Sequence, residues 1–252
     1  PAFCELKTVA PRKEELSFAA GWLSERYAGA PQLAARGAAR TGAGLVTLAA
    51  PESALARMGD DPTVMRLFLP GDSWCAGQLD RLATAMQRCS ALVTGPGMGR
   101  EPGVTALLDG LLALEIGLMR SLMLTARDTC QASPHGVLTP HPGEAARLLD
   151  WSTDAVQRDR VGALRALMER SPAVWILKGV GTLVARAGSP IHVSAWNEPN
   201  LAVGGSGDVL AGCVGALLAQ GAEPLAAACA AVCLHATAGR LLRERFALRG
   251  NT

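Results

Sequence analysis

The strongest constraint on the fold is that short, continuous apolar runs alternate along the chain with longer segments of helical pattern. Runs that are apolar throughout, and not at every second residue, are typical of a parallel sheet covered by helices on both faces. The last two runs lie close enough in sequence to form a hairpin. The expected strands are residues 45–50, 91–94, 122–125, 136–139, 173–178, 182–186 and 191–194, and the expected helices are residues 29–40, 78–88, 103–116, 143–149, 153–170, 209–218 and 224–245.

Composition indicates one well-buried α/β domain, residues 1–252, in a reducing cytoplasm. Of the 252 residues, 49% are hydrophobic, and 24 Lys and Arg against 22 Asp and Glu leave a net charge of +2, which predicts neither a nucleic-acid nor a membrane partner. Seven scattered Cys without CxxC spacing indicate no disulfide framework and no zinc site. We find no signal peptide and no apolar run approaching the length of a membrane span.

A glycine-rich loop, residues 200–208, ends in one carboxylate and leads directly into a helix. Small residues at a helix N-terminus leave backbone N–H groups free, and these groups together with the helix dipole can bind a phosphate. Asp208 lies in or just before the first turn, where an acid can act as a base beside that anion. The alternative is that Asp208 only caps the helix and the glycines only form a flexible turn.

Three other loops that follow expected strands also carry residues suited to a ligand. Residues 95–99, Gly-Pro-Gly-Met-Gly, would let the backbone approach a nucleotide, although they match neither the GxGxxG nor the Walker pattern. His141 is held between two prolines, and Lys178 precedes Gly-Val-Gly-Thr. A tight turn, a structural histidine and a solvated lysine are the respective alternatives. Ligands of parallel sheets collect at the carboxyl ends of the strands, so the four loops together predict a phosphate-bearing ligand.

In this order the segments resemble the ADP- or ATP-dependent NAD(P)H-hydrate dehydratases of the ribokinase-like superfamily. The proline-flanked His141 together with the Gly-Gly-Ser-Gly-Asp that ends at Asp208 is the most specific part. Related thiazole and pyrimidine kinases are similar in fold but usually carry Cys at the position of Asp208. The matching segments are residues 27–30, 40–47, 95–99, 139–144, 177–179 and 204–212.

The resemblance implies a three-layer α/β/α fold with a mostly parallel central sheet, and a repair enzyme that restores NADH or NADPH from the 6-hydroxylated hydrate. Asp208 would deprotonate the substrate hydroxyl, the hydroxyl would attack the terminal phosphoryl group of ADP or ATP, and loss of phosphate would regenerate the ring double bond. The N–H groups of residues 205–207 would stabilise the phosphoryl charge. Mg²⁺ would bridge phosphate oxygens without a metal site built from protein ligands.

The same resemblance assigns the binding residues and leaves two choices open. It does not distinguish ADP from ATP, or NADH hydrate from NADPH hydrate, and it implies a homo-oligomer. The hydrate would contact Ala30, Gly97, Gly99, His141 and Asp208. The adenine nucleotide would contact Lys178, Gly179, Val180, Gly181, Thr182, Gly204, Gly205, Ser206 and Gly207.

Two stretches depart from the family pattern. Residues 12–17 and 21–24 hold few of the glycines usual in the family's first loop, and residues 125–128 read Thr-Ala-Arg-Asp where Asp-Ala-Asp is usual. Arg127 reverses the local charge, which predicts altered handling of magnesium or substrate. Two other functions therefore stay open: a different small-molecule kinase with Asp208 as its base, and a catalytically silent homologue that binds a nucleotide or a partner.

Overall fold

A nine-stranded sheet in the order β3-β2-β1-β4-β5-β6-β7-β8-β9 organises the chain. The computed structural model describes residues 17–21, 29–59, 61–96, 102–113, 121–124 and 134–245. Neighbouring strands pair in parallel from β3 to β7, whereas β7, β8 and β9 pair antiparallel. The strands are β1 (Ser17–Gly21), β2 (Leu45–Pro51), β3 (Met65–Leu69), β4 (Ala91–Thr94), β5 (Ser121–Leu124), β6 (Gly136–Leu138), β7 (Val174–Leu177), β8 (Leu183–Ala185) and β9 (His192–Val193).

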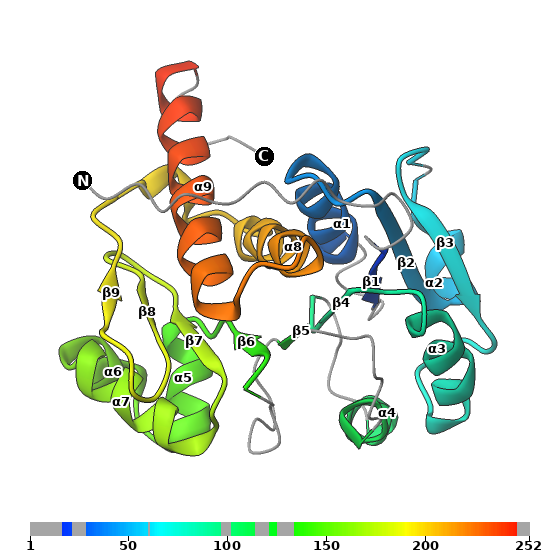
Figure 1. Cartoon of the computed structure of the whole chain (residues 1–252), viewed down its shortest axis with the longest axis horizontal. Coiled ribbons are helices and arrows are strands. Elements are labelled where there is room, and N and C mark those ends of the chain that lie inside the picture. The colour runs from blue at the N-terminus through cyan, green and yellow to red at the C-terminus, as the bar shows by residue number, and fades with distance from the viewer. Residues whose placement is uncertain are drawn as a thin grey trace.

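Helices cover both faces of the sheet, which confirms the predicted three layers. Helices α1, α8 and α9 lie on one face, and α3 to α7 lie on the other (Figure 1). Buried apolar side chains fill the space on each side, with Trp175 of β7 fully buried. The helices are α1 (Gly29–Arg40), α2 (Glu52–Ala56), α3 (Leu79–Met86), α4 (Pro102–Ala113), α5 (Pro142–Leu149), α6 (Thr153–Arg158), α7 (Arg160–Arg170), α8 (Ser206–Ala219) and α9 (Pro224–Arg245), with short 3₁₀ turns η1 (Ala76–Gln78) and η3 (Pro199–Leu201).

The observed elements differ from the sequence prediction at β1, β3, α2 and residues 153–170, and no helix was predicted for residues 52–56 of α2. Strands β1 and β3 were not predicted. Strand β1 reads Ser-Phe-Ala-Ala-Gly, and its small residues give no strong apolar run, whereas β3 is an edge strand in which Arg66 follows Met65 and both Met65 and Phe68 are exposed. The single helix predicted for residues 153–170 is wrong, because Asp159 leaves the helical conformation and its carboxylate accepts the N–H of Gly162 to cap α7. The predicted hairpin is confirmed as β8 and β9.

Helix α9 corrects the expectation that no apolar segment of the chain approaches the length of a membrane span. Among the described helices, it is long and apolar enough to cross a membrane by length and composition, a test that the core helix of a soluble protein also passes. One side of α9 is buried through Ala227, Ala228 and Ala231, which belong to the main core. In this fold α9 therefore serves as a packing helix beside α8 (Figure 1).

Helices α1 and α8 pack so closely that their backbones touch. A methyl group at Gly37 would lie 2.6 Å from the carbonyl oxygen of Val209, and one at Gly212 would overlap the carbonyl oxygen of Ala34. Only glycine leaves room for a neighbouring backbone at such positions. The contact fixes α8, and with it the glycine-rich loop at its N-terminus, against α1.

We expect Gly212→Ala to destabilise the protein by about 2–3 kcal/mol, because the added methyl group forces the two backbones apart. Thermal unfolding measures the effect, and Gly29→Ala is the matched control because a methyl group there meets no atom within 4 Å. Equal melting temperatures for the two variants would contradict the backbone contact between α1 and α8.

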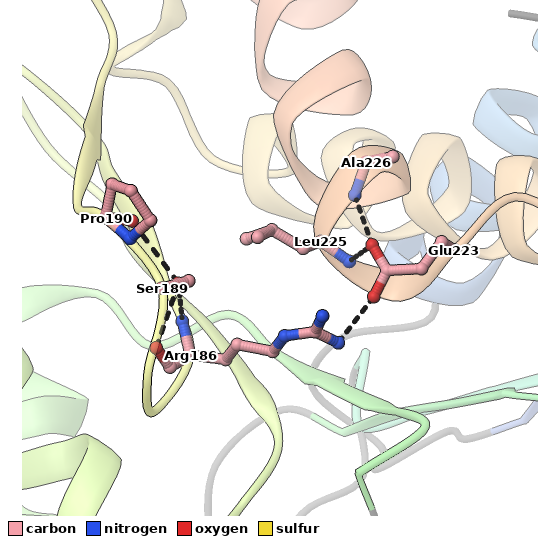
Figure 2. Close-up of polar contacts among 6 residues, drawn as sticks. All are labelled: Arg186, Ser189, Pro190, Glu223, Leu225 and Ala226. Carbon is pink, nitrogen blue, oxygen red and sulfur yellow. Dashed lines mark hydrogen bonds and ion pairs between the residues drawn. The ribbon is translucent and has the colours of Figure 1, made fainter.

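Glu223 joins the hairpin to the start of α9 (Figure 2). One carboxylate oxygen accepts the N–H groups of Leu225 and Ala226 at 3.0 and 3.1 Å, which caps the helix, and the other pairs with Arg186 after β8. The hydroxyl of Ser189 accepts the Arg186 N–H at 3.0 Å and so closes the turn that follows. One side chain thus holds both elements together.

We expect Glu223→Ala to lower the free energy of unfolding by about 1–2 kcal/mol, because it removes a helix cap and an exposed ion pair. Glu223→Gln keeps an oxygen that can cap the helix but loses the charge, so its loss should be smaller. Chemical denaturation of both variants checks the order. A larger loss for Gln than for Ala would show that Glu223 does not act as the cap.

Candidate active site

A cavity of about 510 Å³ opens beside the N-terminus of α8. Its walls come from the loop after β6, the loop after β7, the segment between β9 and α8, and one side of α9. Strands β6 and β7 are parallel neighbours, so the loops that follow them meet at one edge, where the N–H of Lys178 donates to the carbonyl oxygen of Pro140 at 2.9 Å. The cavity therefore lies at the carboxyl ends of the strands, where ligands of such sheets bind.

The glycine-rich loop forms the start of α8. Gly205 is the N-cap residue, with φ of 87° and no side-chain capping bond, and a side chain there would also overlap Leu33 of α1. The N–H of Ser206 donates to Val203 and that of Asp208 to Gly205. Of the N–H groups predicted to bind phosphate, that of Ser206 is used within the loop, whereas those of Gly205 and Gly207 have no hydrogen-bond partner among the described residues.

Asp208 is the third residue of α8, so the alternative that it caps the helix is wrong. Burial raises the pKa of its carboxyl group from 3.8 to about 6, Lys178 lowers it, and Glu144 raises it further. A carboxylate with a pKa near neutrality is suited to accept a proton in catalysis. The geometry places this acid at the positive end of the helix dipole, directly after Gly207 in the cavity wall.

Lys178 carries the positive charge of the site. Its Nζ lies 3.8 Å from the carboxylate of Glu144, and only 21% of its side chain is exposed, so it is not the solvated lysine of the alternative interpretation. A methyl group at Gly207 would lie 3.1 Å from the same Nζ. The Lys178 ammonium group thus lies beside Gly207 at the start of α8, where it and the free N–H of Gly207 are two donors suited to a phosphate group.

His141 begins α5 and forms a capping box with Glu144. Its ring Nδ1 accepts the backbone N–H groups of Gly143 and Glu144, while the backbone N–H of His141 donates to the carboxylate of Glu144 at 2.7 Å. Burial lowers the pKa of His141, although Glu144 acts in the opposite direction. Because Nδ1 is an acceptor, the neutral ring carries its proton on Nε2, which is left to meet a ligand or Glu144.

A family model described as NAD(P)H-hydrate dehydratase matches residues 21–252. The chain belongs to the NAD(P)H-hydrate dehydratase family. A relative from Coxiella burnetii, the bifunctional NAD(P)H-hydrate repair enzyme Nnr, is 38% identical over 226 residues, which are 88% of this chain and 45% of that protein. The chain thus spans about half the length of the curated relatives that it matches.

Solved structures show that this member of the NAD(P)H-hydrate dehydratase family has the ribokinase-like fold. A ribokinase-like superfamily protein from Enterococcus faecalis aligns with a TM-score of 0.76 at 22% identity, over 94% of this chain and 83% of that one. The ADP/ATP-dependent NAD(P)H-hydrate dehydratase of Bacillus subtilis, co-crystallised with ATP/Mg²⁺, aligns with a TM-score of 0.76 at 21% identity, over 97% and 87%. The predicted fold class is confirmed.

The structure brings many of the residues predicted for this family member to one cavity. Ala30 is partly buried in the first turn of α1 and Asp208 lies next to the cavity wall, whereas Gly97 and Gly99 lie outside the described residues. Arg127 and residues 12–16 and 22–24 also lie outside them. Of the residues assigned to the hydrate or the nucleotide, those that line the cavity are His141, Lys178, Gly179, Val180, Thr182, Ser206 and Gly207; Gly181, Gly204 and Gly205 do not.

Sequence reasoning missed the wall formed by residues 194–199 and α9, whereas residues 200–203 belong to the glycine-rich loop that it singled out. Two contacts fasten this segment to α9: the Arg240 guanidinium lies 5.2 Å from the Trp196 ring centroid, and Arg243 lies 3.4 Å from the buried Glu198. Residues 194–199 show no periodic pattern that would have revealed them. His235 could have indicated this wall from the sequence, because it is a polar residue among the buried apolar positions of a helix.

Proposed function

We propose that the chain is a nucleotide-dependent dehydratase that restores NADH or NADPH from its hydrate. Membership of the NAD(P)H-hydrate dehydratase family supports the reaction, and the name of the Coxiella burnetii relative supports the substrate. The observation that carries the proposal is a partly buried Asp208 with its pKa raised to about 6, next to Gly207 in the first turn of α8 and within the electrostatic influence of Lys178. Such an acid is ionised at neutral pH and is basic enough to accept a proton.

In the proposed mechanism, Asp208 takes the proton of the substrate's ring hydroxyl group. The hydroxyl oxygen then attacks the terminal phosphorus of the nucleotide, and the bond between that phosphorus and the bridging oxygen breaks. Lys178 and the N–H of Gly207 stabilise the negative charge on the moving group. Inorganic phosphate leaves with the former hydroxyl oxygen, and loss of a proton from the adjacent ring carbon forms the double bond.

The described residues suit a Mg²⁺ ion that arrives with the nucleotide. They contain no group of three or more His, Cys, Asp or Glu that could hold a metal ion. Mg²⁺ commonly keeps several waters and uses one or two carboxylates together with substrate phosphates. Two carboxylates lie next to lining residues of the cavity: Glu144 pairs with Lys178, and Asp208 follows Gly207. When bound, the ion would neutralise charge on the phosphate oxygens. The Bacillus subtilis structure with ATP/Mg²⁺ supports this part of the proposal.

The test is to incubate the protein with NADH hydrate or NADPH hydrate, Mg²⁺, and either ADP or ATP. We expect the absorbance band of the reduced nicotinamide ring to return only when a nucleotide is present. Four parallel reactions show which hydrate and which nucleotide the chain prefers. Nucleotide binding without recovery of the band in any reaction would overturn the proposal and favour a different kinase or a silent homologue.

A further inference from the structure

His235 and Ser206 form a polar pair in the cavity that the mechanism above leaves unused. The Nε2 atom of His235 lies 3.1 Å from the hydroxyl oxygen of Ser206. Ser206 is the first residue of α8 and His235 belongs to α9, so the pair joins two helices. Both residues line the cavity, which places their polar atoms where a ligand of the glycine-rich loop would bind.

His235 sits among apolar neighbours and is neutral at neutral pH. Val232 and Ala236 are buried on either side of it, and both also line the cavity. Burial lowers the pKa of His235, the charge of Lys178 lowers it further, and the backbone of Ser206 acts in the opposite direction. A neutral imidazole has one N–H donor and one acceptor nitrogen, so the hydrogen bond to Ser206 has two possible directions.

The direction of this bond decides what Ser206 can offer a ligand. If Nε2 accepts, the only proton of the Ser206 hydroxyl points at His235, and the ligand meets lone pairs that repel phosphate oxygens. If Nε2–H donates, the hydroxyl proton is free to donate to a phosphate oxygen. The nearby Lys178 and the free N–H of Gly207 make the site attractive to anions. A hydrogen bond donated by Nε2–H to Ser206 adds the Ser206 hydroxyl to these donors.

We propose that His235 is a positioning residue that donates from Nε2 to Ser206, so that the Ser206 hydroxyl donates to a phosphate oxygen of the bound adenine nucleotide. The identity of the ligand rests on the proposed function. His235 itself need not touch the nucleotide. The two side chains should therefore act as one unit, since His235 contributes only through Ser206.

A double-mutant cycle tests this coupling. Calorimetric titration with ADP and with ATP, each with Mg²⁺, gives dissociation constants for the wild type, His235→Ala, Ser206→Ala and the double variant. We expect Ser206→Ala to bind on the order of tenfold more weakly, because a hydrogen bond to a charged group is lost. His235→Ala should also bind more weakly, because the Ser206 hydroxyl loses the donor that orients it, and the double variant should bind no more weakly than Ser206→Ala. In turnover, KM for the nucleotide should rise by the same factor while KM for the hydrate stays constant.

Conservative replacement separates positioning from packing. His235→Gln places an amide N–H near the position of Nε2 and should recover most of the lost affinity, whereas His235→Leu should not. Thr237→Ala, on the exposed side of α9, is the control and should bind like the wild type. Melting temperatures of all variants are measured alongside. The inference would be overturned if the loss of nucleotide affinity tracked the loss of thermal stability and did not depend on whether residue 235 can donate a hydrogen bond.

The outcomes also separate this inference from the proposed function. A wild type that binds ADP or ATP but never restores NADH overturns the function, while the binding cycle still decides the role of His235. A wild type that restores NADH while the His235 and Ser206 variants lose affinity additively, or not at all, overturns the inference alone. Absence of binding to either nucleotide overturns the inference as well.

Discussion

Asp208→Asn should lower kcat by about 10²–10⁴-fold and leave the affinity for ADP or ATP nearly unchanged, because it removes the general base and keeps the shape of the side chain. The loss should appear in kcat and in kcat/KM for the hydrate to a similar extent, as expected when an interaction acts only in the transition state. Steady-state kinetics with a spectroscopic readout of the reduced nicotinamide measure both. A variant that keeps most of its turnover would show that Asp208 is not the base.

Stability provides the control for this variant. Burial raises the pKa of Asp208 from 3.8 in the unfolded chain to about 6 in the folded protein. Ionisation of Asp208 therefore lowers the free energy of unfolding as the pH rises from 3.8 to about 6. Asp208→Asn should therefore melt at a higher temperature than the wild type at pH 8, and this advantage should disappear near pH 4. Asp109→Asn, at an exposed position of α4 across the sheet, should change neither activity nor stability.

Lys178→Met should raise KM for the nucleotide by about 10–100-fold, the loss expected for a charged hydrogen bond to a phosphate. The same change should also shift the pH at which the rate falls on the acid side of the pH–rate profile. Asp208 must be ionised to act, so the rate falls as pH drops through its pKa of about 6. Lys178 lowers that pKa, whereas burial and Glu144 raise it, so removing Lys178 shifts this acid limb of the profile to higher pH.

Lys178→Arg is the matched control for the two effects. It keeps the positive charge in a side chain of different shape, so KM for the nucleotide can rise while the acid limb stays near its position in the wild type. A profile that moves equally in both variants would contradict an electrostatic link between Lys178 and Asp208. Rates measured across pH 5 to pH 9 with saturating nucleotide separate these cases.

Much of the fold and half of the site could be predicted because they depend on local patterns. The apolar runs that became β4 and β7 are continuous, and the loops after β6 and β7 carry their polar residues at the ends of those runs. Parallel strands bring such ends to the same edge of the sheet, so the pattern indicates that His141 and Lys178 lie at one edge, and the pairing of β6 with β7 places them together. The raised pKa of Asp208 could not be predicted, because it depends on tertiary burial.

The missed half of the site depends on contacts that no local pattern encodes. Segment 194–199 takes its place through Trp196 and Glu198, which contact arginines more than 40 residues further along the chain. The pairing of Ser206 with His235 spans 29 residues and two helices. Strand β1 escaped notice for another reason, since a strand between two neighbours can be built from small residues that carry no strong apolar signal.

The glycine contacts between α1 and α8 set the precision with which the reacting groups can be held. No flexible side chain lies between Gly212 and the carbonyl group of Ala34 to absorb a small shift, so α8 cannot slide along α1 without separating two backbones. Catalysis by an acid and a bound phosphate is sensitive to displacements of about 1 Å. The backbone that carries Asp208 is therefore held in place by the rigid contact of α8 with α1, and not by adjustable side-chain packing.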